Sequence, residues 1–331
     1  KSYSEELLEE VNSVRKEHGQ KEFKSITNEE LTFNEKTGEE QIKTKTKHIK
    51  KSTTDPDSGD YHKGEHERCF AYTHNVCCCK NAFVLEFETT AGNVHDSVSF
   101  ENVRNNVMKE HDEEIDMEAL DSGYKTPAIC KLILESGKIP LMPYTRPKGS
   151  KELYRKNEFV YNEELDNYIC PNNEILNYST TDRNGYKIYK SKKDKCLNCP
   201  LRSKCTKSKN SAKSISRHVW QSFIEQTNDI RYTETWKEIY PLRKETIERV
   251  FGDCKENMGL RFTRVRGIEK NRCNASMIFA CHNLKKMALW KRKYDKKDSK
   301  ISPISSTVNK IYIFFKKKTK QLINIVTLST V

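Results

Sequence analysis

The pattern of apolar and polar positions changes sharply near residue 68. Residues 1–60 are mostly charged or polar; they predict one amphipathic helix over 3–19 and no apolar strand. Residues 69–79 and 81–92 are rich in apolar and β-branched positions and are separated by a short turn, which predicts an antiparallel hairpin. The three cysteines that end the first of these strands are expected to be core residues or to fill one face of the strand, with metal binding as the alternative.

A strand–helix–strand pattern follows the hairpin. After a helix predicted over 93–110, residues 115–121 alternate apolar and polar positions as a half-buried strand does, and this strand ends at Asp121. A helix over 125–136 leads into a strand over 138–144. Such a unit favours two parallel strands with a ligand crevice at their carboxyl ends. Asp121 is therefore a candidate site residue.

A polar, basic, cysteine-bearing insertion at 145–215 interrupts this pattern, and helical periodicity returns over 218–226, 233–259 and 267–290. The sequence predicts an α/β fold, in which a mixed sheet is flanked by helices and carries a cysteine-rich insertion. The expected domains are a charged, partly helical linker at 1–60, the first part of the main domain at 61–144, the insertion at 145–215, the helical remainder at 216–290 and a basic tail at 291–331.

The predicted helix around Glu248 has two distinct faces. Apolar residues recur at helical spacing and predict a buried stripe of Ile247, Val250, Phe251, Cys254 and Met258. An adjacent face carries Lys244, Glu248, Gly252 and Lys255. Pairing of lysine with glutamate on a solvent face is one explanation of these charges. Glycine destabilises a helix interior by about 1 kcal/mol relative to alanine. Its presence at position 252 therefore favours a second explanation, in which this face lets a ligand or a backbone come close.

Asp121 and Glu248 together predict a metal site. A carboxylate at a strand end and another on a later helix can share a divalent cation, because Mg²⁺ takes carboxylate oxygens and keeps positions open for phosphates. Two such ions roughly 3.5–4 Å apart can hold both oxygens of a phosphodiester displacement. Alone, Asp121 is also an ordinary turn residue ahead of Gly123. We expect Mg²⁺, or Mn²⁺ in its place, at the two carboxylates.

The cysteines of the insertion have the spacing of a structural zinc site. Cys196 and Cys199 form a C-x-x-C pair, Cys205 follows shortly after, and Cys170 lies upstream. Four thiolates bind Zn²⁺ tetrahedrally, and a metal stabilises a polar segment that has little core of its own. His218 is the alternative fourth ligand. Reduced loop cysteines are a simpler explanation, and an iron–sulfur cluster is a third.

The composition and the net charge of the chain favour a polyanion as its partner. The chain of 331 residues has 60 Lys and Arg against 47 Asp and Glu, a net charge of +13. Candidate phosphate contacts are Arg261, Arg264 and Arg266, with Lys244 and Lys255 nearby. Each is also an ordinary surface charge when taken singly, and codon bias toward lysine is an alternative. The sequence shows no apolar run of membrane-spanning length and no signal peptide, and its cysteines indicate a reducing compartment.

Several motifs, in order, resemble the cysteine-bearing branch of the DDE transposases of bacterial insertion sequences. They are ALDSGYKT at 119–126, DNYICP at 166–171, CLNCPLRSKCTKS at 196–208, RHVW at 217–220 and RKETIERVFGDCKENMGLRFTRVRG at 243–267. The resemblance covers about residues 50–290 and implies an RNase H-like catalytic domain. It makes Asp121 the second catalytic aspartate, Glu248 the catalytic glutamate and Lys255 the lysine of a Tyr-Arg-Glu-Lys signature. Arg243 lies one position too far from Glu248, so either Lys244 takes the arginine's place or the helix begins differently.

The resemblance also implies what is missing. The family's first catalytic aspartate lies in a strand ahead of the hairpin, and residues 1–60 show no such apolar strand. Asp55 and Asp57 lie in a polar linker, and Asp96 is expected to cap or orient a helix. We therefore expect a chain truncated at its N-terminus, with weak metal binding, no central strand and an open sheet edge prone to association.

The expected function is transposition: hydrolysis of phosphodiesters at transposon ends with Mg²⁺ or Mn²⁺, then strand transfer into target DNA, impaired here by the lost aspartate. The resemblance implies DNA as the partner, a homodimer when active, no membrane, and a cytoplasmic, nucleoid-associated bacterial protein. One alternative is a non-catalytic transposase remnant or repurposed derivative that binds nucleic acid. Another is a zinc-stabilised nuclease of unrelated role.

Overall fold

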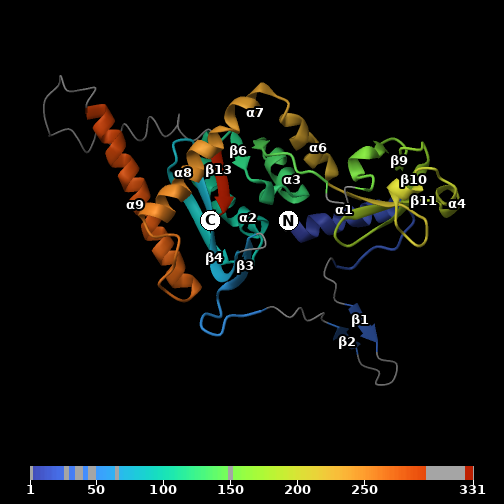
Figure 1. The fold of residues 1–331 in the computed structure, drawn as a ribbon, viewed down its shortest axis with the longest axis horizontal. Helices are drawn as coiled ribbons and strands as arrows, with labels where there is room; N and C mark the ends of the chain where they lie inside the picture. The colour runs from blue at the N-terminus through green and yellow to red at the C-terminus, as the bar shows by residue number, and fades with distance from the viewer. Residues whose placement is uncertain are drawn as a thin grey trace. The chain divides into compact units, whose positions relative to one another are not determined.

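The computed structural model describes residues 3–25, 30–33, 40–43, 50–63, 67–147, 152–295 and 325–330. Its backbone contacts divide the chain into two units. Unit 1 comprises residues 1–47 and 145–222, and unit 2 comprises residues 48–144 and 223–331 (Figure 1).

Unit 2 is built on one mixed sheet. Its strands are β3 (Gly59–Lys63), β4 (Glu67–Cys79), β5 (Val84–Ala91), β6 (Met117–Leu120), β7 (Ile139–Leu141) and β13 (Ile325–Thr330). β4 pairs antiparallel with β3 along its first half and with β5 along its second half, so the predicted hairpin of β4 and β5 is confirmed. β6 and β7 are parallel, as the strand–helix–strand pattern predicts.

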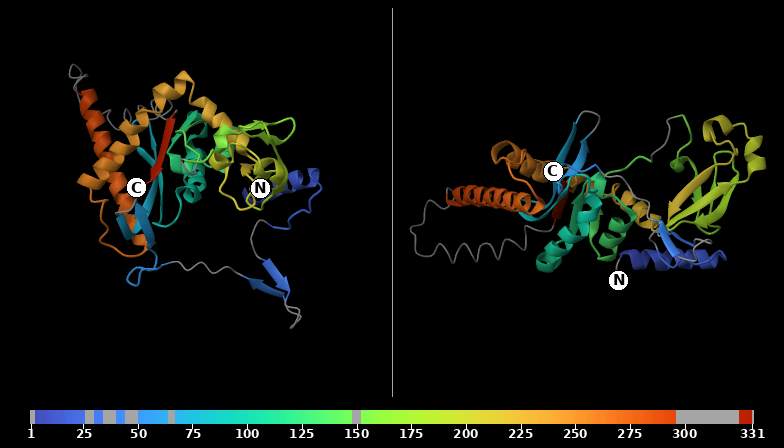
Figure 2. Two further views of the ribbon diagram at one scale, coloured as in Figure 1. Left: turned by 45° about the vertical axis from the view of Figure 1, so that its right-hand side comes forward. Right: turned by 90° about the horizontal axis from the view of Figure 1, so that it is seen from below.

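β13 lies between the two halves of this sheet (Figures 1 and 2). It pairs antiparallel with β4 on one side and parallel with β6 on the other. The expectation of a missing central strand and an open edge is therefore wrong for unit 2, because the far end of the chain supplies the strand. The apolar patch at 311–315 of the basic tail lies outside the described residues.

Helices cover both faces of the sheet. They are α2 (Asp96–His111), α3 (Pro127–Glu135), α6 (Gln221–Ile230), α7 (Glu234–Ile239), α8 (Leu242–Asn257) and α9 (Ile268–Asp295), with short 3-10 turns at η1 (Asp112–Glu114) and η2 (Ser122–Tyr124). Successive side chains of a strand point to opposite faces. Cys77 accordingly packs with Phe100 of α2 and Ile133 of α3, whereas Cys78 packs with Ile247 of α8. The expectation that the consecutive cysteines are core residues is confirmed.

The helix predicted over 233–259 is broken into α7 and α8 at Pro241. Proline has no backbone N–H to continue a hydrogen-bond ladder, so it lies at the start of α8. The apolar stripe of α8 is confirmed: Ile247, Val250, Phe251 and Cys254 are buried, and Met258 packs against the same cluster.

The insertion in unit 1 is a β-sheet with a core of its own, so the expectation of a polar segment with little core is wrong. Its strands are β8 (Val160–Asn162), β9 (Asn167–Ile169), β10 (Ile175–Thr181), β11 (Tyr186–Ser191) and β12 (Ser214–His218), and its short helices are η3 (Lys156–Glu158), α4 (Lys193–Leu197) and α5 (Arg202–Cys205). The strands form an antiparallel sheet in the order β12-β11-β10-β9-β8. Aromatic residues carry its core, with Tyr168 and Tyr189 fully packed around Leu176. Because tyrosine is amphipathic, polarity along the sequence hid this core.

The N-terminal helix α1 (Tyr3–Glu17) forms as predicted and packs on β10 of the same unit. The Arg15 guanidinium donates to the carbonyl of Thr181 at 2.7 Å, and Gln20 donates to the carbonyl of Ser179 at 2.9 Å. The charged segment that follows also contains polar strands, β1 (Glu30–Phe33) and β2 (Glu40–Lys43), paired with each other. Among the described helices, none combines the length and the hydropathy that a bilayer crossing needs.

Candidate functional site

Asp121 lies at the carboxyl end of β6, as predicted. The strand itself is buried at Glu118, Ala119 and Leu120, and the chain then turns into η2. Asp121 caps that turn, since its Oδ1 accepts the N–H of Ser122 at 2.6 Å. Its side chain is 47% exposed. The second carboxylate oxygen is therefore available to an exogenous group or a neighbouring side chain.

Glu248 lies on the solvent side of α8, next to the apolar stripe, with its side chain 53% exposed. Its neighbours on that face, Lys244 and Gly252, are exposed too. A Cβ added at Gly252 would meet nothing within 4 Å. No described part of the chain therefore requires glycine at this position, and a role for it in ligand approach stays a prediction.

One arginine joins the two carboxylates. Nη2 of Arg243 lies 3.1 Å from Oδ2 of Asp121, and Nη1 lies 3.6 Å from Oε1 of Glu248. The Arg243 side chain is only 9% exposed, whereas Lys244 points to solvent. Arg243, and not Lys244, is thus the basic residue that contacts both carboxylates. It does so although it lies one position farther from Glu248 than the family signature requires.

Aromatic residues flank this arrangement. Trp236 stacks on Tyr240 with ring centroids 4.8 Å apart, and its Nε1 donates to the carbonyl of Met142 just beyond β7. The pKa of Tyr240 is raised above its usual value, mainly by burial. The Arg243 guanidinium opposes this shift, and the carboxylates of Asp121 and Glu248 add to it. Tyr240 therefore lies within the electrostatic reach of the site.

An arginine with several aromatic neighbours lies on the same side of unit 2. The Arg231 guanidinium is 5.1 Å from the ring centroid of Tyr144, 5.8 Å from that of Tyr232 and 5.7 Å from that of Trp236. Tyr232 is 75% exposed. Sequence reasoning missed this group, although the spacing of aromatic residues just before α8 could have indicated it.

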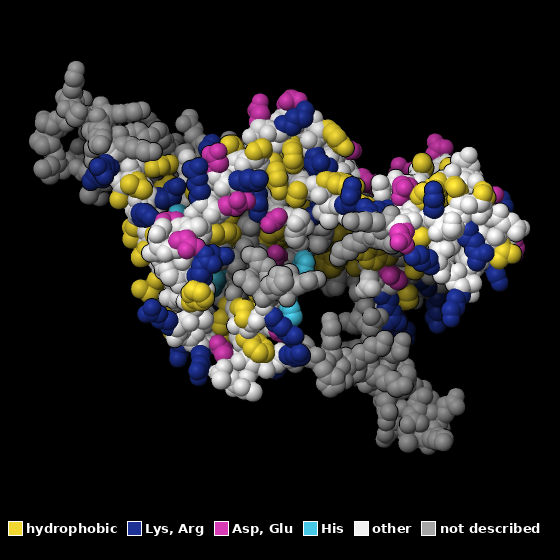
Figure 3. Space-filling view, in the orientation of Figure 1, with side chains coloured by type: hydrophobic (Ala, Val, Ile, Leu, Met, Phe, Trp, Pro, Cys, Tyr) yellow, Lys and Arg dark blue, Asp and Glu magenta, His cyan; other side chains and the backbone are white. Residues whose placement is uncertain are grey.

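The other predicted DNA contacts lie in the last turn of α8 and in the segment after it. Arg261, Arg264 and Arg266 are exposed, and Arg261 forms an ion pair with Glu256. Lys255 is partly buried, and its ammonium lies 6.0 Å from the Phe251 ring centroid. Figure 3 shows that Lys and Arg side chains on one face are scattered among Asp and Glu side chains rather than gathered into one patch.

Metal ligands do not converge in the described part of the chain. No group of three or more His, Cys, Asp or Glu residues there is arranged to hold a metal ion. Asp96 is near η2, since a Cβ added at Gly123 would lie 3.0 Å from its Oδ2, but it does not complete such a group with Asp121. The candidate pair therefore consists of two half-exposed carboxylates around a guanidinium.

Asp55 and Asp57, set aside as linker residues, fix the start of α9. Asp55 accepts hydrogen bonds from the Tyr72 hydroxyl at 2.9 Å and from the Gly267 N–H at 3.2 Å. Asp57 accepts the N–H of Ile268 at 3.2 Å. Carboxylates satisfy the free N–H groups of a helix N-terminus, which explains why a polar linker is ordered here.

The cysteines of the insertion surround one small cavity in unit 1. The cavity is about 20 Å³ in volume, and its lining includes Cys170, Cys196, Cys199 and Cys205. The N–H of Glu174 donates to Sγ of Cys170 at 3.3 Å. The pKa of the Cys205 thiol is raised above its usual value, mainly by burial. Lys213 opposes this shift, and the other thiols of the group add to it. The thiols share a cavity without converging on one point.

His218, the alternative zinc ligand, does not line that cavity. It is buried on β12, where its Nδ1 accepts the N–H of Trp220 at 3.1 Å and its ring lies 5.1 Å from the ring of Tyr186. Burial lowers the pKa of His218 to about 4. It is a neutral core residue.

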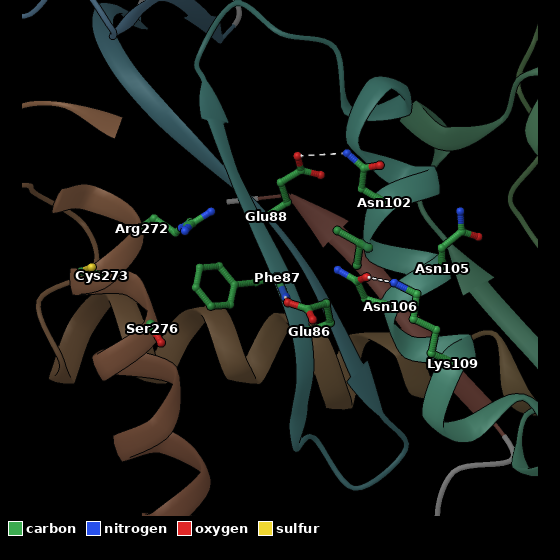
Figure 4. A pocket seen from close by; sticks show the side chains of 11 residues that line it. Glu86, Phe87, Glu88, Asn102, Asn105, Asn106, Lys109, Arg272, Cys273 and Ser276 are labelled. Carbon is green, nitrogen blue, oxygen red and sulfur yellow. Dashed lines mark hydrogen bonds between the residues drawn. The ribbon is translucent and has the colours of Figure 1, made fainter. Parts of the chain in front are cut away.

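A separate cavity of about 680 Å³ follows the outer edge of β5 in unit 2 (Figure 4). Its walls come from α2, which presents Asn102, Asn105, Asn106 and Lys109, and from α9, which presents Arg272, Cys273 and Ser276. Oε1 of Glu88 accepts a hydrogen bond from Asn102 at 3.4 Å, whereas its buried Oε2 has no hydrogen-bond partner among the described residues. Neither carboxylate of the candidate site lines this cavity.

Residues 169–288 match the model of a family described as the transposase DDE domain. The matched stretch begins beside Cys170 and includes Arg243 and Glu248, but it does not reach Asp121. The match supports a DDE transposase with DNA as its partner. No curated protein and no solved structure matches the chain.

Proposed function

We propose that the chain carries the catalytic part of a DDE-type transposase, which cleaves phosphodiesters at transposon ends and joins them to target DNA. The observation that carries this proposal is the convergence of Asp121 and Glu248 on the guanidinium of Arg243. These residues come from a strand end and a helix that are far apart in the sequence. The transposase DDE match over 169–288 supports the same function.

The sheet of unit 2 supports an RNase H-like arrangement. Antiparallel strands β5, β4 and β13 are followed across the sheet by β6 and β7, which run parallel to β13 and to each other. Ligands of sheets with parallel strands bind beyond the carboxyl ends of those strands, which is where Asp121 lies. Helix α8 then brings Glu248 to the same edge.

The residues present fit a weak site for Mg²⁺ or Mn²⁺. Asp121 and Glu248 are hard oxygen donors, and half of each side chain is exposed. Mg²⁺ is commonly held by one or two carboxylates with waters and substrate phosphates in the remaining positions. When bound, the ion would supply Lewis-acid stabilisation of charge on the phosphate and of an attacking hydroxide. Arg243 neutralises the same carboxylates in its absence.

The basic and aromatic residues around the site suit DNA. Exposed Arg264 and Arg266 and the partly paired Arg261 can contact phosphates, which gives affinity without sequence readout. Arg231 and the exposed ring of Tyr232 offer a surface on which an unpaired base can stack. Transposition would need a homodimer, and a nucleoid location follows from DNA binding.

A non-catalytic DNA-binding protein is the second candidate function. The described residues offer no third acidic residue to the pair, and the segment 325–330, which fills the sheet beside Asp121, contains no acidic residue. Two carboxylates hold a catalytic metal less firmly than three. The chain would then keep the shape and the DNA contacts of a transposase while losing most of its activity.

Calorimetric titration with Mn²⁺ separates these two functions. Wild-type protein should show a specific binding isotherm that Asp121→Asn and Glu248→Gln each abolish, and Glu245→Gln, an exposed acid on the same helix, should leave it intact. The same preparations should bind double-stranded DNA in a gel-shift assay. A wild-type protein that binds DNA but shows only the isotherm of the two variants supports the non-catalytic function.

We also propose a structural Zn²⁺ ion in unit 1. Four thiols from the end of β9, from α4 and the turn after it, and from α5 line a single enclosed cavity, and a backbone N–H already donates to one of the sulfurs. Four cysteine thiolates are a ligand set that Zn²⁺ binds tetrahedrally in structural sites. Because zinc binds thiolates, it would displace the thiol protons.

Metal analysis of the purified protein tests the zinc site. We expect about one equivalent of zinc, its loss in Cys199→Ser, and its retention in Cys273→Ser, a variant at an exposed cysteine of α9 in unit 2. Chelation should speed amide exchange in β9 and α4. A metal-free protein in which added Zn²⁺ alters neither exchange nor thermal stability would rule the site out.

A further inference from the structure

The last described segment of the chain completes the sheet of unit 2. Thr327 of β13 is in register with Cys78 of β4, and Leu328 is in register with Cys77. On its other side, Leu328 is in register with Leu120 of β6. β13 is therefore an internal strand with a backbone partner on each side.

The sites that β13 covers are buried on both neighbours. On β4 the paired residues include Val76, Cys77 and Cys78, each 0% exposed, and on β6 they include Glu118 and Leu120, also 0% exposed. Buried backbone N–H and C=O groups without partners destabilise a protein by about 1–3 kcal/mol each. A gap between β4 and β6 would leave several such groups unpaired, so this part of unit 2 needs a strand.

The segment has the composition that such a position requires. It reads IVTLST, with β-branched residues at most positions and neither glycine, proline nor charge. A strand that is internal to a sheet cannot contain proline without losing a ladder hydrogen bond. The basic run that precedes the segment is chemically distinct from it.

We propose that the space between β4 and β6 is a binding slot for a β-strand, and that residues 325–330 of the same chain fill it. The slot accepts the strand parallel to β6, which brings the carboxyl end of β13 next to the carboxyl end of β6. The register that pairs Leu328 with Leu120 places Ser329 level with Asp121. If the proposed function holds, the C-terminal segment forms one side of the catalytic site; the strand insertion itself does not depend on that function.

Native cysteines on β4 make the register testable by cross-linking. Thr327→Cys should form a disulfide with Cys78, and Leu328→Cys should form one with Cys77. Directly opposite residues in antiparallel strands alternate between hydrogen-bonded and non-hydrogen-bonded pairs, and the latter bring Cα atoms to about 4.5 Å, within the range for a disulfide. One of the two variants thus has favourable geometry. Thr327→Cys in a Cys78→Ser background is the matched control, and Thr330→Cys, opposite Asn75, is a second control.

Mild oxidation followed by peptide mass spectrometry gives the result. We expect a cross-linked peptide within monomeric protein from at least one test variant and from neither control. Cross-linked dimers would show that the strand comes from a second copy, which overturns insertion in the same chain. As a measurement on the unaltered protein, hydrogen exchange at 325–330 should be as slow as in β6. Fast exchange there, with no cross-link in a folded variant, overturns the slot itself.

The cross-linking experiment tests the position of β13 independently of the proposed function. The cross-link reports the position of the strand whether or not the protein binds metal or DNA. A correct register together with absent Mn²⁺ binding would leave β13 in place and remove only the catalytic site.

Discussion

Nη2 of Arg243 lies 3.1 Å from Oδ2 of Asp121 and so connects helix α8 to the carboxyl end of β6. The guanidinium is 9% exposed, whereas the carboxylate is 47% exposed. A buried charge is strongly destabilising when its partner is removed, but a half-exposed carboxylate can be hydrated instead. The arginine therefore depends on the carboxylates more than they depend on it, and the carboxylates can exchange it for another cation.

Replacing Arg243 should strengthen metal binding and lower the stability of the fold. In Arg243→Gln the carboxylates of Asp121 and Glu248 lose their resident positive charge, so a divalent cation no longer competes with it. We expect a several-fold lower dissociation constant for Mn²⁺ in calorimetry. We also expect a loss of about 1–3 kcal/mol in the free energy of unfolding, since a charged hydrogen-bond partner is removed from a largely buried position.

Lys244→Gln is the matched control for this prediction. Lys244 is adjacent in sequence and carries the same charge, but it is exposed. It should leave both Mn²⁺ affinity and stability close to the wild-type values. Equal effects of the two substitutions would mean that net charge, and not the contact with Asp121, governs metal binding.

A second arginine should matter for stability alone. Nε of Arg104 on α2 donates to Oε1 of Glu118 on β6 at 2.9 Å, and its Nη2 donates to the Ser136 hydroxyl at 2.6 Å. Burial raises the pKa of Glu118, and the neighbouring guanidinium lowers it. Arg104→Met, which leaves a buried carboxylate unpaired, should lower the free energy of unfolding by about 3–5 kcal/mol.

The double variant Arg104→Met with Glu118→Gln tests the reason. With both charges removed, urea denaturation should show a smaller loss than the single variant shows. A double variant at least as unstable as Arg104→Met would mean that the lost packing of the arginine stem, and not the unpaired carboxylate, causes the effect.

Sequence periodicity predicted most of unit 2 because its elements are local. The alternation over 115–121 places Asp121 at a strand end, and the apolar stripe of α8 fixes which side of Glu248 faces solvent. What periodicity could not predict is an arrangement between distant segments. The contact of Arg243 with both carboxylates depends on how α8 packs over the sheet, and the spacing before Glu248 left open which basic residue reaches the site.

Sequence patterns did not predict the core of the insertion, because its buried residues carry polar groups. Tyr168 and Tyr189 form the core of the insertion, yet their hydroxyl groups make that stretch read as polar. β13 was missed for a different reason. A short apolar segment after a basic run carries no signal of its partners, since pairing between β13 and β4 joins residues that are remote in sequence.

The exposed ring of Tyr232 should contribute to binding of unpaired DNA. Tyr232→Ala should raise the dissociation constant for a single-stranded oligonucleotide about 5–150-fold, because stacking of a base on an aromatic ring is worth about 1–3 kcal/mol. Tyr232→Phe keeps the ring and should bind as the wild type does in fluorescence anisotropy. A variant with phenylalanine that binds as poorly as the alanine variant would assign the effect to the hydroxyl group.

Unit 2 should lose stability in mild acid through His74. Burial and, to a smaller extent, the nearby Lys255 ammonium together lower the pKa of His74 to about 4. The facing side chains are Thr89, whose Oγ1 lies 3.0 Å from Nδ1, and the ring of Phe279. The unfolded chain binds this proton near pH 6.5 and the folded chain only near pH 4, so stability is present above 6.5 and falls as the pH drops.

Chemical denaturation at pH 7 and pH 4.5 measures this effect. His74 alone should contribute a loss of about 2 kcal/mol over that interval. His74→Gln, which keeps a neutral polar group, should remove that part of the pH dependence while other groups still titrate. An unchanged pH profile in His74→Gln would show that the histidine is hydrated or already protonated in the folded protein.

A carboxylate introduced beside Asp121 should strengthen the proposed metal site. Ser329 is in register with Val76 of β4, whose side chain packs on the α8 side of the sheet, and it follows the pair of Leu328 and Leu120. The parallel register of β13 and β6 places position 329 level with Asp121, where both strands end. Ser329→Asp should therefore supply a third acidic ligand.

We expect Ser329→Asp to lower the dissociation constant for Mn²⁺ about tenfold, or by about 1.4 kcal/mol. Ser329→Asn is the neutral control of similar size. Combining Ser329→Asp with Asp121→Asn should cancel the gain. If the gain persists in that double variant, the new carboxylate binds metal elsewhere, and Asp121 is not its partner.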